Sequence, residues 1–256
     1  MRPLILISND DGLEYPGIQT LIDIAKPLGD VVVVSPLRHQ SGMSNAITIV
    51  TPLRAYKSID EEGYTVWQVD GTPTDCMKLA LDQLLGGRRP DLVLSGINHG
   101  YNAGVSTIYS GTIGVILEAV ARHIPAIAFS SGSIERDIDF TPCLSIIDGI
   151  IRNALSNLEA LRDVCLNVNM PAGIAHFEGV KLTTTAIGHW EKEYDHRVDP
   201  HGGDYYWLQG SYVSDDPEDD KNDLYWLKRG WVSVTPLHVD QTAFEAFSAM
   251  SSLLKI

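Results

Sequence analysis

Uninterrupted apolar runs alternate with amphipathic stretches along most of the chain. Residues 4–7 and 31–34 are runs of branched aliphatic residues, which is the pattern of strands buried on both faces of a parallel sheet. Residues 16–28 carry apolar side chains at helical spacing and end at Gly29, which predicts a helix. Short connections between successive strands and helices predict right-handed crossovers, and therefore an α/β fold with a mostly parallel sheet.

The middle of the chain continues this alternation. A helix is predicted over residues 72–84, with Thr72 as its N-cap and Asp75 placed to offset the helix dipole. Residues 47–54 and 64–70 alternate between polar and apolar positions on either side of an acidic turn, which predicts a β-hairpin. Further strands are predicted at residues 92–94, 126–129 and 164–168, and further helices at residues 113–122 and 142–158.

The character of the chain changes after about residue 180. Residues 183–187 and 205–210 have the pattern of antiparallel strands, and residues 215–220 form a charged loop. A last strand is predicted at residues 232–237 and a closing helix at residues 240–254. A carboxyl-terminal β arm that leaves a compact core is a candidate for docking on a second subunit, and packing on its own core fits the pattern equally well.

Composition narrows the class of protein. The chain has 256 residues, which suits one α/β domain or one domain with an appendage. Its formal net charge of −14 argues against duplex nucleic acid as a partner, because phosphate backbones are bound by clustered Lys and Arg. An anionic substrate must therefore meet a local positive feature, and a bound metal ion would supply one.

Two further observations bear on the compartment. Cys76, Cys143 and Cys165 are odd in number and widely spaced among apolar residues, which is typical of reduced core thiols in a cytosolic protein. No apolar stretch approaches the about 20 residues of a membrane span, and the amino-terminal apolar run meets Asp10 too early for a signal peptide. We therefore expect a cytoplasmic protein with no membrane partner.

Candidate metal ligands follow three of the predicted strands. Asp10 and Asp11 end the first strand, where adjacent carboxylates repel each other unless a cation lies between them. Ser41 and Asn98 follow two other strands, and the carboxyl ends of parallel strands are where ligands bind in open α/β sheets. Each residue alone also fits a turn or a cap. Together they form an all-oxygen set, which favours Mg²⁺, Mn²⁺ or Ca²⁺ over zinc.

A candidate phosphate site lies at the start of the helix after residue 110. Ser110, Gly111 and Thr112 combine free backbone N–H groups, a glycine and two hydroxyls, and the same residues also fit an ordinary N-cap. A metal ion facing a phosphate cradle suggests phosphoester hydrolysis. Asp10 could then act as base or nucleophile, with Asn9 as a donor to phosphate; the spacing does not decide between these roles.

Six ordered motifs, which span nearly the whole chain, resemble those of the SurE family of stationary-phase survival proteins. They lie at residues 7–12, 35–42, 70–76, 95–104, 109–112 and 234–237. The resemblance implies a metal-dependent phosphatase that acts on nucleoside 5′-monophosphates, often also on 3′-monophosphates and short polyphosphate. It implies a Rossmann-like three-layer core, a carboxyl-terminal β-hairpin arm and a closing helix. It also implies a cytoplasmic homodimer or homotetramer assembled through an exchanged carboxyl-terminal segment.

Carried over residue by residue, the resemblance implies one divalent ion, Mg²⁺ or Mn²⁺, per subunit. The family's metal ligands fall on Asp10, Asp11, Ser41 and Asn98, and its phosphate contacts fall near Asn9 and on Ser110, Gly111 and Thr112. The chain then divides into a Rossmann-like catalytic core, residues 1–180, and an oligomerisation element, residues 181–256.

The chain departs from the family at two points. Residues 219–227 replace a Gly-Thr-Asp stretch, and Phe244 stands where some bacterial members have a histidine, so no role is carried over to that position. His238 could stand in as a proton donor or could simply pack on the surface. Arg38 and His39 flank the site and could contact the phosphate or the base, or belong to a solvated loop.

Some aromatic residues fit more than one role, and three rival classes of protein share parts of the pattern. Tyr101 and the cluster at residues 205–207 could stack on a nucleobase, or pack in the core or at a subunit interface. A receiver-type signalling module would need an Asp at the end of the third parallel strand, and a haloacid-dehalogenase-like phosphatase would need Asp-x-Asp after the first. The chain has neither pattern. A nucleotide-binding regulatory protein that holds a metal but turns nothing over stays compatible with the sequence.

Overall fold

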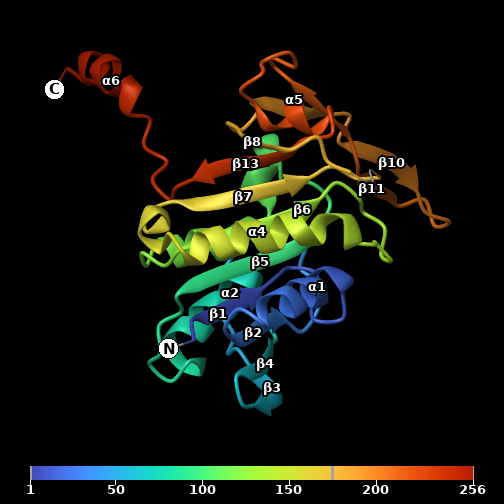
Figure 1. The fold of residues 1–256 in the computed structure, drawn as a ribbon. Helices are drawn as coiled ribbons and strands as arrows, with labels where there is room; N and C mark the ends of the chain where they lie inside the picture. The colour runs from blue at the N-terminus through green and yellow to red at the C-terminus, as the bar shows by residue number, and fades with distance from the viewer. Residues whose placement is uncertain (1, 174–175, 256) are drawn as a thin grey trace.

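A nine-stranded sheet forms the centre of the computed structural model, which describes residues 2–173 and 176–255 (Figure 1). In spatial order its strands are β3 (Ala55–Glu61), β4 (Tyr64–Val69), β2 (Asp30–Pro36), β1 (Leu4–Ser8), β5 (Leu92–His99), β6 (Ala126–Ser131), β7 (Cys165–Met170), β13 (Val232–Leu237) and β8 (Val180–Leu182). The strands from β4 to β7 pair in parallel, whereas β3 runs antiparallel to β4 and β13 antiparallel to β7. The expected mostly parallel α/β sheet is confirmed.

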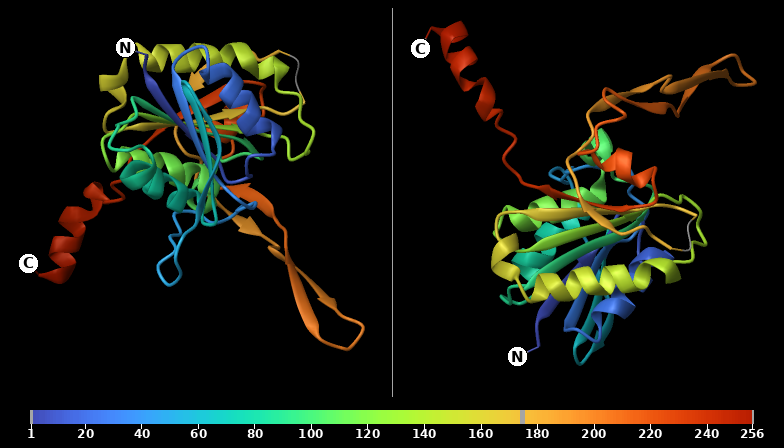
Figure 2. Two further views of the ribbon diagram at one scale, coloured as in Figure 1. Left: turned by 90° about the horizontal axis from the view of Figure 1, so that it is seen from below. Right: turned by 45° about the horizontal axis from the view of Figure 1, so that its top comes forward.

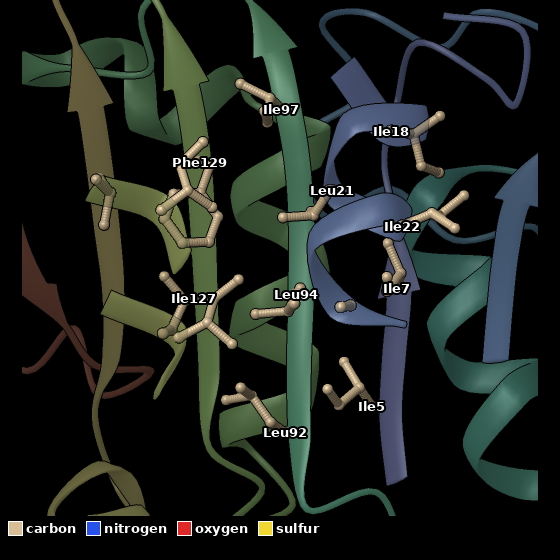
Figure 3. Close-up of a cluster of buried hydrophobic side chains, with 14 of the residues drawn as sticks. Ile5, Ile7, Ile18, Leu21, Ile22, Leu92, Leu94, Ile97, Ile127 and Phe129 are labelled. Atoms are coloured by element: carbon tan, nitrogen blue, oxygen red, sulfur yellow. The ribbon is translucent and has the colours of Figure 1, made fainter. Parts of the chain in front are cut away.

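Helices cover both faces of the sheet and complete the three layers. Helices α1 (Pro16–Ala25) and α4 (Leu144–Leu155) pack on one face, and α2 (Pro73–Leu79) and α3 (Gly111–Val120) pack on the other. On strand β1, Ile5 and Ile7 join the first cluster and Leu4 and Leu6 join the second. Figure 3 shows Ile5 and Ile7 beside the side chains of α1. Because both faces are covered, an uninterrupted apolar run is the sequence that this strand requires.

Helix α2 begins with the predicted cap. The Thr72 hydroxyl accepts the Asp75 N–H at 3.1 Å, and the Asp75 carboxylate accepts the Thr72 N–H at 2.9 Å, so the two residues form a capping box. The same carboxylate accepts the backbone N–H of Thr48 at 2.9 Å and its hydroxyl at 2.6 Å. Asp75 therefore fixes both the start of α2 and the long loop that follows β2.

The prediction of a strand at residues 47–54 is wrong. The hairpin is built from β3 and β4 instead, and residues 47–54 form an irregular loop. Thr48 is bound to Asp75, and Val50 is 96% exposed, so the alternating pattern has no neighbouring strand to pair with. Hydrophobic alternation cannot distinguish a paired strand from a loop that is held by a distant carboxylate.

The carboxyl-terminal part forms an arm and a separate helix. Strands β9 (Gly188–Glu191) and β12 (Ser211–Ser214) pair antiparallel, as do β10 (Tyr194–Val198) and β11 (Asp204–Leu208). We call residues 188–214 the arm; it projects from the body, as Figure 2 shows. Helix α5 (Asp223–Leu227) returns the chain to β13, and α6 (Phe247–Leu254) lies apart from the body at the end of an extended segment (Figure 1). The expected arm and closing helix are confirmed.

Details of this part differ from the expectation. Residues 183–187 form no strand, and Thr184 makes only an isolated bridge to Asn222. The closing helix is shorter than residues 240–254, because only Phe247–Leu254 are α-helical. Two strands that lie largely after residue 180, β8 and β13, extend the central sheet. Among the described residues, no helix combines the length and the apolar character needed to cross a membrane.

Candidate active site

The predicted ligand loops meet where the strand order reverses. Strand β1 lies between β2 and β5, so the chain leaves it in opposite directions, and a crevice opens at the carboxyl ends of these strands. The backbone N–H of Gln40, after β2, donates to the Asp10 carbonyl at 2.8 Å. The backbone N–H of His99, at the end of β5, lies 3.4 Å from a carboxylate oxygen of Asp11. Three loops that are distant in sequence therefore converge on the paired acids.

Asp10 and Asn98 are linked through Thr112. The Thr112 hydroxyl donates to Asp10 Oδ1 at 2.5 Å and lies 3.4 Å from Asn98 Oδ1. The Asn98 amide nitrogen donates to the Gly100 carbonyl at 2.9 Å, so the amide oxygen is directed toward Thr112 and Asp10. This orientation presents an oxygen rather than an N–H group beside the carboxylate, as a hard cation requires.

Asp11 and Ser41 are linked through His39. His39 Nδ1 lies 3.4 Å from Asp11 Oδ1, and His39 Nε2 lies 2.7 Å from the Ser41 hydroxyl. The imidazole ring stacks on Tyr15, with 5.6 Å between the ring centroids. The sequence left open whether His39 belongs to a solvated loop; the structure brings it into contact with two of the predicted metal ligands.

The adjacent carboxyl groups of Asp10 and Asp11 are buried without a basic side chain of Lys or Arg beside them among the described residues. Asp10 and Asp11 are each only 3% exposed, and among the described residues neither forms an ion pair with Lys or Arg. Burial raises the pKa of Asp10, although its hydrogen bond from Thr112 opposes the shift. Burial and the neighbouring charge of Asp10 raise the pKa of Asp11 to about 7. A bound divalent cation would remove this repulsion, so the donor set fits such an ion.

Among the described residues, no cluster of acidic, histidine or cysteine side chains is an alternative metal site. Within residues 2–173 and 176–255, no group of three or more His, Cys, Asp and Glu side chains is arranged to hold a metal ion. The candidate set depends instead on two carboxylates with a hydroxyl and an amide oxygen. The role of these four residues as ligands stays a prediction.

The start of α3 closes one side of the site. The Ser110 hydroxyl accepts the Ile113 N–H at 3.1 Å and caps the helix. A Cβ atom at Gly111 would lie 3.0 Å from the Asp10 Cβ and 2.9 Å from the Pro73 Cγ. Glycine is therefore required for the helix to begin this close to Asp10.

Asn9 lies behind the carboxylates rather than in the open crevice. It is fully buried, and its amide nitrogen donates to the Gly12 carbonyl at 3.0 Å. Its amide oxygen has no hydrogen-bond partner among the described residues. Asn9 thus holds the turn that carries Asp10 and Asp11, and a direct contact with phosphate stays a prediction.

A cavity of about 740 Å³ joins the core residues to the arm. From the core, Asp10, Ser41, Asn98 and Ser110 line it. From the base of the arm, Trp190, Tyr194 and Leu208 line it, together with the polar residues Glu193 and Gln209. Its size is that of a small-molecule site. The arm residues carried no sequence pattern that marked them, because their position depends on where the root of the arm is attached to the core.

Five residues considered from the sequence lie elsewhere. Tyr101 packs against Gly132, where an added Cβ would lie 2.3 Å from the Tyr101 ring, and residues 205–207 lie on β11 outside the cavity lining. His238 follows Leu237, which pairs with Cys165 at the start of β7. Since β13 runs antiparallel, His238 lies at the opposite edge of the sheet from Asp10, so the sheet direction contradicts a role as proton donor at this site.

Comparison with known proteins identifies the family. The family model for survival protein SurE matches residues 5–192. The 5′-nucleotidase SurE of Christiangramia forsetii is 43% identical over 254 residues, which cover 98% of this chain and 96% of that protein. The 5′-nucleotidase SurE of Cytophaga hutchinsonii is 42% identical, with 98% and 96% covered. The crystal structure of SurE from Aquifex aeolicus, 34% identical, superposes with a TM-score of 0.83 over 98% of this chain and 99% of that one. The chain belongs to the SurE family.

Proposed function

We propose that the protein is a divalent-metal-dependent phosphatase that hydrolyses nucleoside 5′-monophosphates to nucleoside and phosphate. The observation that carries the proposal is the meeting of Asp10, Ser41 and Asn98 on one cavity with the start of α3. The relatives named 5′-nucleotidase support the substrate class. Nucleoside 3′-monophosphates and short polyphosphate share the phosphate group that this site would bind, and we include them as further candidate substrates.

The proposed metal is one Mg²⁺ or Mn²⁺ per subunit. Asp10, Asp11, Ser41 and Asn98 would hold it, because two carboxylates neutralise a divalent ion and two neutral oxygens complete a hard donor set. When bound, the ion would polarise a phosphoryl oxygen and lower the pKa of bound water. His39 would orient Ser41 and Asp11 from behind.

The remaining roles belong to residues of the chain itself. Ser110, Gly111 and Thr112, at the start of α3, would bind the phosphate, and Asn9 stays a predicted additional donor. Thr112 orients Asp10 through its hydrogen bond. Asp10 would act as the base that accepts a proton from the attacking water, or as the nucleophile itself.

A phosphate-release assay tests the proposal. Wild-type protein and the Asp10→Asn variant would be assayed on a panel of nucleoside 5′- and 3′-monophosphates, with Mn²⁺ and with a chelator. We expect release that requires the metal and falls at least 100-fold in the variant. Absence of metal-dependent release from every nucleotide would overturn the proposal and favour a nucleotide-binding regulator. Circular dichroism of the variant checks that its fold is intact.

We also propose that residues 181–256 mediate a homodimer or homotetramer, with residues 1–180 as the catalytic core in a cytoplasmic enzyme. Five large apolar side chains within residues 240–255 are exposed: Phe244, Phe247, Met250, Leu253 and Leu254. A chain that ends at residue 239 keeps β13 in the sheet and is therefore a sharper test than a longer deletion. Light scattering should give a lower oligomer mass for this chain, and an unchanged mass would exclude residues 240–256 as the contact.

A further inference from the structure

We infer that the base of the arm is the nucleobase subsite, where a flat aromatic ring stacks on Trp190 beside Tyr194 and Leu208. This inference rests on the proposed function, because it assigns the part of a nucleotide that the phosphate site leaves unassigned. The starting observation is that one cavity is lined by Asp10 and Ser110 from the core and by Trp190, Tyr194 and Leu208 from the arm. A phosphate ion alone needs only the polar part of this lining.

Trp190 is held in place from behind. It is half-buried and faces Tyr212 across the β9–β12 pair, with 5.9 Å between the ring centroids and an edge-on angle of 77°. The Tyr212 hydroxyl donates to the Ala186 carbonyl at 3.0 Å. Gly188 permits this packing, because a Cβ there would lie 2.6 Å from the Tyr212 hydroxyl. The indole is therefore a pre-positioned surface, which reduces the entropy lost when a ligand stacks on it.

Tyr194 and Leu208 extend the apolar surface. They face each other directly across the β10–β11 pair and are 66% and 71% exposed. Exposed aromatic and aliphatic side chains at the mouth of a polar site are a binding surface for an amphipathic ligand. A nucleoside monophosphate has this character, since its base offers two apolar faces while its phosphate is charged. Base stacking on aromatic side chains tolerates any base, because every base has a π-face.

The arm base is fixed to the core close to the candidate metal loop. The buried Asp223 carboxylate accepts the N–H of Gly104 at 2.8 Å and the N–H of Ala186 at 3.1 Å. Gly104 follows the loop that leaves the end of β5, where Asn98 lies, and Ala186 lies two residues before the arm. One carboxylate therefore connects the segment that follows the candidate metal ligand Asn98 to the root of the arm.

Two polar residues at the base of the arm, Glu193 and Gln209, could form hydrogen bonds with the edge of a nucleobase. The backbone N–H of Gln209 donates to the backbone carbonyl of Glu193 at 2.7 Å, so the two residues lie side by side in the cavity lining. A carboxylate accepts hydrogen bonds from the ring N–H and amino groups of a base, and an amide both donates and accepts. This pair gives the arm base the hydrogen-bonding capacity of a nucleobase site in addition to its stacking surface.

Comparison of two substrates tests the inference. Trp190→Ala would be assayed with a nucleoside 5′-monophosphate and with glycerol 2-phosphate, which has no ring. We expect the ratio of kcat/KM for the nucleotide to that for glycerol phosphate to fall about 10-fold or more, mainly through KM. Trp207→Ala is the matched control, since Trp207 is an exposed arm aromatic outside the cavity lining. Its ratio should equal that of the wild type.

A binding measurement separates this inference from the proposed function. Calorimetric titration of the metal-free wild-type protein with adenosine or guanosine should show binding, and Trp190→Ala should weaken the binding about 10-fold while Trp207→Ala does not. An unchanged substrate ratio in Trp190→Ala, or an equal loss for both substrates, would overturn the inference. If the wild type releases no phosphate from any substrate, the proposed function fails, and the nucleoside titration alone decides the subsite.

Discussion

Replacement of Asp11 by Asn should stabilise the metal-free protein, and the size of the effect depends on pH. Burial and the charge of Asp10 raise the pKa of Asp11 from an ordinary 3.8 to about 7 in the folded protein. A carboxyl with a raised folded-state pKa binds its proton more tightly when folded. Its contribution to stability is therefore complete below pH 3.8 and is lost as the pH rises toward 7. Asparagine has the shape of the neutral carboxyl but does not ionise, so the variant is not destabilised as the pH rises.

The magnitude follows from the shift in pKa. At about 1.36 kcal/mol per pKa unit, ionisation of Asp11 costs the folded state roughly 2 kcal/mol at pH 5 and roughly 4 kcal/mol at pH 8. The free energy of unfolding of Asp11→Asn should exceed that of the wild type by about these amounts in a chelator. Saturating Mn²⁺ should reverse the order, because it stabilises the wild type in proportion to its affinity and the variant much less.

Urea unfolding followed by circular dichroism measures both effects. Wild type and Asp11→Asn would be unfolded at pH 5 and pH 8, with a chelator and with Mn²⁺. The difference between the two proteins cancels the contributions of groups that lie far from Asp11. The reasoning would be refuted if the two proteins had the same free energy of unfolding at pH 8 in a chelator. It would also be refuted if the difference between them did not increase from pH 5 to pH 8.

Three further predictions follow from particular contacts. Gly111→Ala should lower phosphatase activity at least 10-fold by displacing Asp10, whereas Gly149→Ala in α4, where an added Cβ meets nothing within 4 Å, should leave activity unchanged; equal activities would remove the steric argument. Asp75→Ala should lower the free energy of unfolding by about 3 kcal/mol, because it leaves several donors without a partner, and the exposed turn variant Glu62→Ala should not; chemical denaturation compares them. His39→Ala should weaken Mn²⁺ binding about 10-fold in a calorimetric titration, and an unchanged affinity would make His39 a bystander.

The layered core could be predicted because its causes are local. An apolar run such as residues 4–7 has one stable use, a strand covered on both faces, and Thr72 with Asp75 marks a helix start within four residues. The convergence of Asp10, Ser41 and Asn98 could also be predicted. The carboxyl ends of neighbouring parallel strands meet at one edge, so order along the chain is enough.

The parts that could not be predicted depend on contacts between distant residues. The loop at residues 47–54 has the alternating pattern of a strand, but Thr48 is bound to the distant Asp75 instead of to a neighbouring strand. Trp190 reaches the cavity because Asp223 fixes the root of the arm to Gly104, across 119 positions of sequence. The sequence is compatible with His238 as a proton donor because the direction of β13 has no signature in it. In each case the local pattern was compatible with two positions in space.

The proposed function requires that oxygen atoms from three loops hold one divalent ion beside the start of α3. Titration of Mn²⁺ into the metal-free protein, followed by the electron paramagnetic resonance signal of the free ion, tests this requirement most directly. We expect one Mn²⁺ bound per chain, a loss of affinity of at least 100-fold in Asp10→Asn, and no change in the exposed control Asp163→Asn. Equal Mn²⁺ binding by wild type and Asp10→Asn, or no binding by the wild type, would contradict it.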